Sequence, residues 1–238
     1  GGSCSSSTTS AISGNNTITL VSLSDGTYSD CTIVVTDSAG NASNTLTITS
    51  FTVDSTVETL TEVTAVTTPT NDSTPDYTFY SSTAGTITYG GSCSSSTTSA
   101  IIGNNTVTLE SLSDGTYSDC TITVTDSSNN SVTLNISSFT VDSTAATLTE
   151  VTAVTTPTSD TTPDYTFSSS TSGTITYGGS CSSSTTSAVS GNNSITLNTL
   201  SRGTYSDCTV TVTDSASNSV TLNMSSFSVI ELMGGSFQ

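Results

Sequence analysis

The sequence of 238 residues lacks histidine and tryptophan, and Arg202 is its only basic side chain against 19 Asp and Glu, which gives a formal net charge of −18 at pH 7. A chain with so little positive charge is not expected to bind nucleic acid or an anionic membrane surface. Without His or Lys, acid and base catalysis would fall to carboxylates or Tyr, and no base is evident that could activate a Ser. We therefore expect no enzyme, and no residue is assigned a catalytic role.

Long apolar segments are also missing. No run of apolar residues is long enough to cross a bilayer, and the chain carries no secretory signal pattern. Methionine occurs only at positions 224 and 233. We expect no membrane insertion, and we interpret the sequence as a processed product or as part of a longer chain.

A long internal repeat organises the chain. Cys4, Cys93 and Cys181 begin nearly the same block of sequence, spaced by 89 and then 88 residues. A repeat of this length is close to the size of one small sandwich domain. We predict a partial repeat over residues 1–55 that lacks its first strands, a complete repeat over 56–143, and a complete repeat over 144–238 that ends in a divergent tail.

The cysteines follow the repeat. Each block has a second cysteine 27 positions after the first, which predicts the disulfides Cys4–Cys31, Cys93–Cys120 and Cys181–Cys208. Zinc is the weaker alternative, because a zinc site needs four ligands and each repeat offers two thiols and no imidazole. Disulfides indicate an oxidising, extracellular compartment, and a cross-link would help a small repeat that has few large apolar residues.

Alternation of Thr with Val, Ile and Leu predicts β-strands throughout, and no helical period is present. We expect an all-β fold of tandem antiparallel β-sandwiches with about seven strands each. A change of phase at Phe139 and Val141 predicts a bulge or bend near residues 137–138. In the second repeat the expected strands cover residues 60–66, 76–79, 85–91, a short edge strand or loop within 94–103, then 106–109, 120–125, and 132–136 with its continuation at 139–141.

Three short motifs carry a family resemblance. Asp-Gly-Thr-Tyr precedes an alternating strand, Thr-Asp-Ser-Ala-Gly-Asn follows at 36–41, and Phe-Thr-Val-Asp-Ser-Thr closes the block at 51–56 and 139–144. Together they resemble the bacterial immunoglobulin-like (Big-type) repeats that occur in tandem in large secreted surface adhesins, over nearly the whole chain. The resemblance implies immunoglobulin-like sandwiches at the cell surface. It also implies that Tyr28, Tyr117 and Tyr205 bond to nearby backbone through their hydroxyls.

Within such a sandwich, the first cysteine of each repeat follows the third expected strand and the second opens the sixth. The disulfide is therefore expected to join neighbouring strands of one sheet near one end, rather than to cross the core.

Aspartates recur in turns and at the expected repeat junctions. In related repeats such positions can meet between successive domains and hold calcium, which is the one cofactor that the pattern suggests, although none is required. The alternative is that Asp suits turns through its bonds to the backbone. The candidate metal ligands are Asp37, Asp54, Asp72, Asp76, Asp126, Asp142, Asp160 and Asp164.

A structural role is the leading functional hypothesis: an extracellular repeat region that forms an adhesin stalk or surface filament, with neighbouring repeats or identical subunits as partners. One alternative is a binding module that recognises a cell-surface glycan or protein through loops at a sandwich end. The nearly identical, aromatic-poor loops favour the structural role.

The other alternative is a filament subunit whose open first repeat is completed by strands from a neighbouring chain. The tail at residues 229–233 could donate one strand but not three, so we favour missing strands that lie upstream in a longer protein.

Overall fold

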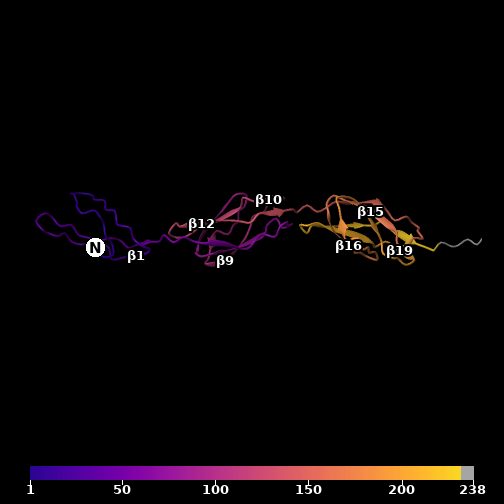
Figure 1. Ribbon diagram of the computed structural model, residues 1–238, viewed down its shortest axis with the longest axis horizontal. Helices are drawn as coiled ribbons and strands as arrows, with labels where there is room; N and C mark the ends of the chain where they lie inside the picture. Colours follow the sequence, from indigo (N-terminus) through magenta and orange to yellow (C-terminus); the bar gives the residue numbers. More distant parts are fainter. Residues whose placement is uncertain (232–238) are drawn as a thin grey trace, which may run out of the picture. The chain divides into compact units, whose positions relative to one another are not determined.

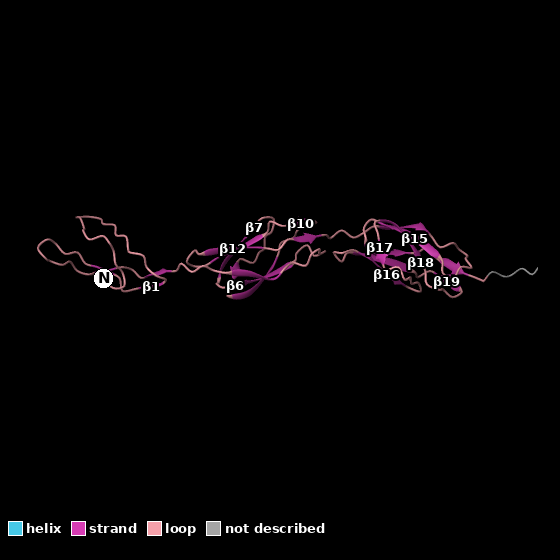
Figure 2. Cartoon of the chain, in the orientation of Figure 1, coloured by secondary structure: helices cyan, strands magenta, loops and turns pink. Residues whose placement is uncertain are grey.

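The computed structural model describes residues 1–231, which form strands, turns and loops (Figures 1 and 2). The all-β prediction is confirmed, since the described residues contain 22 strands and no helix. It follows that residues 1–231 offer no helix able to span a lipid bilayer. Leu232 and Met233, which belong to the tail considered as a donor strand, lie outside the described residues.

The chain divides into two compact units. Unit 1 comprises Gly1–Ala65, Tyr77–Val107 and Cys120–Ile136, and unit 2 comprises Val66–Asp76, Thr108–Asp119 and the described chain from Ser137 onward. The predicted repeat boundaries at 55/56 and 143/144 stay a prediction, because this division crosses the second repeat. The term "repeat" below refers to the sequence ranges 1–55, 56–143 and 144–238.

The strands are short in all three repeats. The first contains β1 (Gly26–Tyr28), β2 (Thr32–Ile33), β3 (Leu46–Thr47) and β4 (Phe51–Val53). The second contains β5 (Leu60–Thr64), β6 (Asp76–Ser81), β7 (Gly85–Gly90), β8 (Ser99–Ala100), β9 (Gly103–Thr108), β10 (Gly115–Tyr117), β11 (Thr121–Thr125), β12 (Ser131–Asn135) and β13 (Phe139–Val141). The third contains β14 (Leu148–Thr152), β15 (Asp164–Ser169), β16 (Gly173–Gly178), β17 (Ser187–Ala188), β18 (Gly191–Thr196), β19 (Gly203–Tyr205), β20 (Thr209–Thr213), β21 (Ser219–Asn223) and β22 (Phe227–Val229).

Unit 1 contains the two largest sheets of the second repeat. One has the strand order β5-β6-β9 and the other β12-β11-β7-β8, with antiparallel pairing in each. Alternation along the strands places every second side chain inside. The fully buried side chains include Tyr77, Phe79, Ile87, Ile122 and Val124.

Unit 2 contains the third repeat, in which two sheets share one core. The sheets have the orders β14-β15-β18 and β17-β16-β20-β21. Tyr165 and Phe167 of the first sheet belong to the same buried cluster as Ile175, Val210 and Val212 of the second. The aliphatic residues that alternate with Thr are therefore the core, as their spacing predicted.

The last four strands of the third repeat form one long hairpin. Gly203 pairs with Val229 and Thr209 with Asn223, and between them the amide of Met224 donates to the carbonyl of Cys208. In an antiparallel pair the residue numbers of partners have a constant sum as long as the register does not shift. The sum is the same at both ends of this hairpin, so β19 and β20 are parts of one strand and β21 and β22 are parts of another. Counted this way, the repeat has about seven strands, as expected. The predicted change of phase coincides with the break between β21 and β22, and with that between β12 and β13 in the second repeat.

Candidate functional site: disulfide turns and linkers

The three predicted disulfides are formed: Cys4–Cys31, Cys93–Cys120 and Cys181–Cys208. All six cysteines are buried. In the third repeat the bond lies beside the point where Gly178 of β16 pairs with Thr209 of β20. It therefore joins two neighbouring strands of one sheet just beyond their ends, as expected. Three disulfides indicate an oxidising environment.

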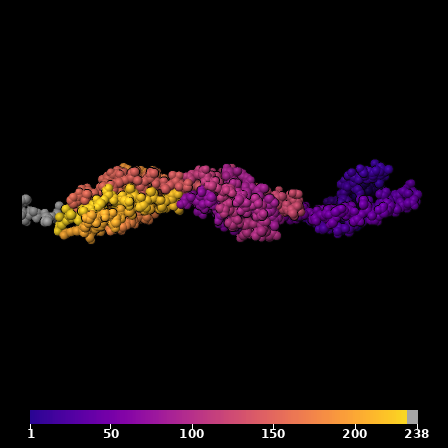
Figure 3. Space-filling model, turned by 180° about the vertical axis from the view of Figure 1, so that it is seen from behind, coloured from indigo at the N-terminus to yellow at the C-terminus, as the bar shows by residue number. Residues whose placement is uncertain are grey.

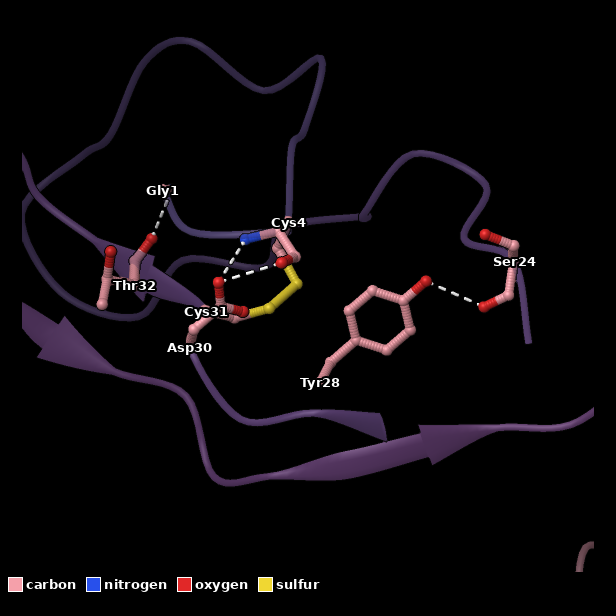
Figure 4. The surroundings of a disulfide bond; sticks show 8 residues. Gly1, Cys4, Ser24, Tyr28, Asp30, Cys31 and Thr32 are labelled. Carbon is pink, nitrogen blue, oxygen red and sulfur yellow. Dashed lines mark hydrogen bonds between the residues drawn. A yellow bond between two sulfur atoms is a disulfide. The ribbon is translucent and has the colours of Figure 1, made fainter. Parts of the chain in front are cut away.

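A tight turn presents the first cysteine of each repeat. Figure 4 shows the turn of the first repeat. In the first repeat the Ser3 amide and hydroxyl both donate to the Asp30 carboxylate, at 3.0 and 2.9 Å. These bonds favour the ionised carboxylate and lower the pKa of Asp30. The Ser180 hydroxyl makes the same bond to Asp207. The residue next to the second cysteine thus fixes the turn that carries the first.

The tyrosine three residues before the second cysteine of each repeat is tied to backbone, which confirms the prediction made from the resemblance. Its hydroxyl donates to the carbonyl four residues upstream, at 2.7 to 2.8 Å, and its ring stacks on a phenylalanine of the opposite strand at a centroid distance of 5.2 to 5.4 Å. The pairs are Tyr28 with Phe51, Tyr117 with Phe139, and Tyr205 with Phe227.

The linker after the first repeat is held from both of its sides. From the preceding repeat, the Asp25 carboxylate accepts the amide and hydroxyl of Ser55 at 2.9 and 2.7 Å. From the following repeat, the Asn130 side-chain amide donates to the Asp54 carbonyl at 3.2 Å. Asn130 is itself fixed, because the Asp126 carboxylate accepts both its backbone and its side-chain amide.

The linker after the second repeat is held in the same way. The Asp114 carboxylate accepts the Ser143 amide and hydroxyl at 2.8 and 2.7 Å, and also the Thr144 hydroxyl at 2.6 Å. These bonds lower the pKa of Asp114. On the other side, the buried Asn218 amide donates to the Asp142 carbonyl at 2.7 Å. We call the pairs Asp25 with Asn130 and Asp114 with Asn218 the linker clamps.

The third repeat departs from this pattern. Arg202 stands where the other repeats have Asp25 and Asp114, and it forms an ion pair with Glu231 at 2.7 Å. Glu231 is two residues beyond the last strand, as Ser55 and Ser143 are in their own repeats. An aspartate and a serine are therefore replaced together by an arginine and a glutamate.

The predicted metal ligands all accept hydrogen bonds close to the turns or strands that carry them. Asp37 and Asp126 bond to the amides two and four residues ahead, and Asp54, Asp72, Asp142 and Asp160 bond to the amide two residues ahead. Asp76 and Asp164 accept the hydroxyls of Thr108 and Thr196 on the neighbouring strand. Within residues 1–231 no three acidic, cysteine or histidine side chains gather closely enough to hold a metal ion. Calcium at the junctions stays a hypothesis, and the turn role is observed for all of these aspartates except Asp76 and Asp164.

Removal of divalent cations tests that hypothesis. Because the eight aspartates already accept hydrogen bonds from the chain itself, we expect excess EDTA to change the melting temperature by less than about 1 °C, a shift that corresponds to well under 1 kcal/mol. Calorimetry with EDTA and with added CaCl₂ at constant ionic strength would check this. Stabilisation by calcium, but not by an equal ionic strength of NaCl, would contradict the expectation.

A glutamate joins the start of the third repeat to its last hairpin. Glu150 of β14 accepts the Ser225 amide at 2.9 Å and the Ser225 hydroxyl at 2.6 Å, at the break between β21 and β22. Burial raises the pKa of Glu150, but the bonds from Ser225 outweigh it, so the pKa lies below its ordinary value of 4.5. Burial and the Glu150 carboxylate raise the pKa of the neighbouring Tyr165 hydroxyl.

This lowered pKa predicts a pH-dependent contribution to stability. The unfolded state binds the proton more tightly than the folded state, so the contribution is present above about pH 4.5 and is lost as the pH falls through the folded pKa. We expect Glu150→Gln to destabilise the third repeat at pH 7 and to match the native chain near pH 2. Denaturation of both chains from pH 7 to pH 2 would measure the difference, which cancels the shared titration of the other carboxylates. A difference that does not depend on pH would contradict the prediction.

The linker clamps are contacts that the sequence did not predict. Two features of the sequence are related to them. The pattern Asp-x-x-x-Asn recurs at 37–41, 126–130 and 214–218. Asp25 and Asp114 recur at the same position of their repeats, as do Ser55 and Ser143 beyond the last strand. Neither signal says that these side chains reach a linker.

Comparison with known proteins gives one partial match. Residues 100–198, less than half of the chain, are similar to the family described as "Calycin-like beta-barrel domain". The matched segment begins in β8 and ends beyond β18, and its strand β11 pairs with β7, which lies outside it. The match agrees with a β-rich repeat protein and does not assign the chain to that family. No curated protein matches the chain.

Proposed function

We propose that the chain is an extracellular structural region of tandem immunoglobulin-like sandwiches, part of an adhesin stalk or a surface filament, and that its work is mechanical rather than catalytic. The topology of the third repeat supports the fold. Counted as seven strands, its first, second and fifth form one sheet and the others form the second. Constant-type immunoglobulin domains differ in that the fourth strand belongs to the first sheet.

The observation that carries the mechanical role is the linker clamp. Flexible linkers between domains are commonly polar and make few contacts, so relative domain motion is the usual expectation. Here each linker bonds to a carboxylate of the repeat before it and to a side-chain amide of the repeat after it. Such bonds limit linker motion, while the disulfide of each repeat limits its unfolding.

The proposed test loosens one linker without touching the cores. Asp114→Ala and Asn218→Ala, alone and together, remove the clamp on the linker at residues 143–147. Asp160→Ala is the matched control, because the Asp160 carboxylate accepts the amide and hydroxyl of Thr162 within its own turn. We expect the double variant to raise the rate of proteolytic cleavage within 143–147 by at least about 10-fold, which corresponds to about 1.4 kcal/mol, roughly the net contribution of one hydrogen bond.

The control should cleave at the native rate. Amide exchange at Val212 should stay unchanged in all variants, because the third-repeat core is intact. Native cleavage rates in the double variant, with Val212 unchanged, would contradict a role of the clamp in holding the linker. A loss of protection at Val212 would instead locate the effect in the fold.

A further inference from the structure

One exposed aromatic side chain distinguishes the second repeat from the third. Tyr80 of β6 is 39% exposed, whereas a serine, Ser168, stands at the equivalent position of the third repeat. The space-filling view shows this part of the chain, in purple and magenta, as a filled body, so a side chain exposed there lies on an outer surface (Figure 3). Tyrosine is one of the residues that protein interfaces favour at their centres, because its ring offers a large and rigid contact area.

The pairing of β6 with β9 brings an exposed isoleucine next to Tyr80. The Thr78 and Thr106 hydroxyls are 2.8 Å apart, and in an antiparallel pair each step forward on one strand is a step back on the other. Ser82 therefore lies opposite Ile102, which is 67% exposed. Tyr80 and Ile102 are diagonal neighbours on the outward face, a separation that an aromatic side chain can span.

A carboxylate is held at the same place. The Ser82 hydroxyl donates to the Glu58 carboxylate at 2.7 Å, and the Thr59 amide donates to the Ser82 hydroxyl at 3.0 Å. A fixed negative charge therefore stands at Ser82, two positions from Tyr80 and opposite Ile102. We call Glu58, Tyr80, Ser82 and Ile102 the Tyr80 face, and all four belong to unit 1.

The third repeat keeps the frame of the Tyr80 face and lacks its three distinctive side chains. The residues that replace Glu58, Tyr80 and Ile102 are Ala146, Ser168 and Ser190. The Thr147 amide donates to the Ser170 hydroxyl at 2.9 Å, as the Thr59 amide does to Ser82. The fold therefore does not require the three side chains, and a carboxylate, an aromatic ring and an aliphatic chain meet at one place on the second repeat for another reason.

The chemistry of the Tyr80 face fits a basic and partly apolar partner. A carboxylate beside an aromatic ring attracts a Lys or Arg side chain through its charge and through the ring face, and Ile102 offers contact to an aliphatic neighbour. The formal net charge of −18 draws such a partner toward the chain. A second copy does not meet the requirement, because the only basic side chain, Arg202, already pairs with Glu231.

We propose that the Tyr80 face is a docking site for a basic segment of another protein. An Arg or Lys of that segment lies on the Tyr80 ring against the Glu58 carboxylate, and an aliphatic neighbour covers Ile102. The site is on a sheet face of the second repeat and not in the loops at a sandwich end. It does not rest on the mechanical role, since the linker clamps and the Tyr80 face share no residue.

The test gives the second repeat the residues of the third in the full chain, as Glu58→Ala, Tyr80→Ser and Ile102→Ser, singly and together. The probe is a fluorescein-labelled peptide of alternating Arg and Leu, and a companion peptide carries neutral citrulline for every Arg. Glu110→Asn is the matched control, because it removes an equal charge beyond the other end of β9 and also takes the third-repeat residue. Fluorescence polarisation measures Kd, and amide exchange at Val124 reports on the core.

We expect Glu58→Ala and Tyr80→Ser each to raise the Kd of the Arg peptide by at least about 10-fold, and the triple variant to abolish binding. The Kd of Glu110→Asn should stay within about 2-fold of the native value, because exposed charges far from a docked group contribute little. The citrulline peptide should not bind, and exchange at Val124 should be unchanged in every variant.

Three results would overturn the proposal: no saturable binding of the Arg peptide to the native chain, equal binding of the citrulline peptide, or an equal loss in Glu110→Asn. The comparison of the two peptides uses the native chain, so it decides the question even if a variant unfolds. A neutral oligosaccharide, cellohexaose, is titrated in parallel. Tyr80-dependent binding of this sugar without binding of the Arg peptide would also overturn the proposal, because the face would then be a glycan site.

Discussion

Replacing Cys181 and Cys208 together by alanine is expected to lower the free energy of unfolding of the third repeat by about 3.5 kcal/mol. The bond closes a loop with a sequence separation of 27, and the chain-entropy relation assigns a loop of this length that cost at 25 °C. A small sandwich rests on a limited core, so this is a large part of its total stability. Amide exchange at Val212 measures it locally, because a chain of several repeats need not unfold in one step.

Chemical reduction provides the control. The reduced native chain keeps both sulfur atoms in the core, so it loses the cross-link with a smaller change in packing than the alanine variant. We expect reduction and double substitution to cost the same within about 1 kcal/mol. A loss under about 1 kcal/mol in both cases would contradict stabilisation by the cross-link. A much larger loss in the alanine variant would show that sulfur packing dominates.

The features that could be predicted from the sequence are those that periodicity encodes. Val210 and Val212 alternate with Thr along β20, and this pattern places them in the core without reference to any distant residue. The constant separation of 27 positions between cysteines likewise predicted the three disulfides. About seven strands per repeat were predicted, and the change of phase at Phe139 and Val141 also predicted the break between β12 and β13.

The linker clamps could not be predicted because they depend on contacts between residues far apart in the sequence. Asn218 and Asp142 are 76 positions apart, and only the fold brings them to 2.7 Å. Asp-x-x-x-Asn is also an ordinary turn pattern, since Asp214 bonds to the turn as well as to Asn218. The sequence therefore indicated the turn but not the hydrogen bond from Asn218 to the Asp142 carbonyl.

Arg202 illustrates the same limit. In the sequence it is evident only as the single basic side chain. In the structure its partner is Glu231, at the position where the other repeats carry Ser55 and Ser143. The arginine and the glutamate changed as a pair, which preserves a bond between the turn and the segment beyond the last strand.

Gly179→Ala is expected to destabilise the third repeat by about 2 to 5 kcal/mol, because two costs add at one atom. Gly179 has a φ of +69°, a conformation that costs an L-residue about 1 to 2 kcal/mol. A Cβ built there would also overlap the backbone carbonyl oxygen of Asp207. Backbone cannot move aside as a flexible side chain can, and overpacking of this kind costs roughly 1 to 3 kcal/mol more.

Gly191→Ala separates the two costs. Gly191 also has a positive φ, of +101°, but no atom lies within 4 Å of a Cβ built on it. It should therefore show the conformational cost alone. The overlap at Gly179 would push Asp207 from the Ser180 hydroxyl, so the variant should also open the turn that presents Cys181. Faster reduction of Cys181–Cys208 in Gly179→Ala than in Gly191→Ala would register that opening. Equal stability and equal reduction rates for the two variants would mean that the turn adapts without cost, and that the Gly-Gly-Ser sequence is not needed to place the disulfide.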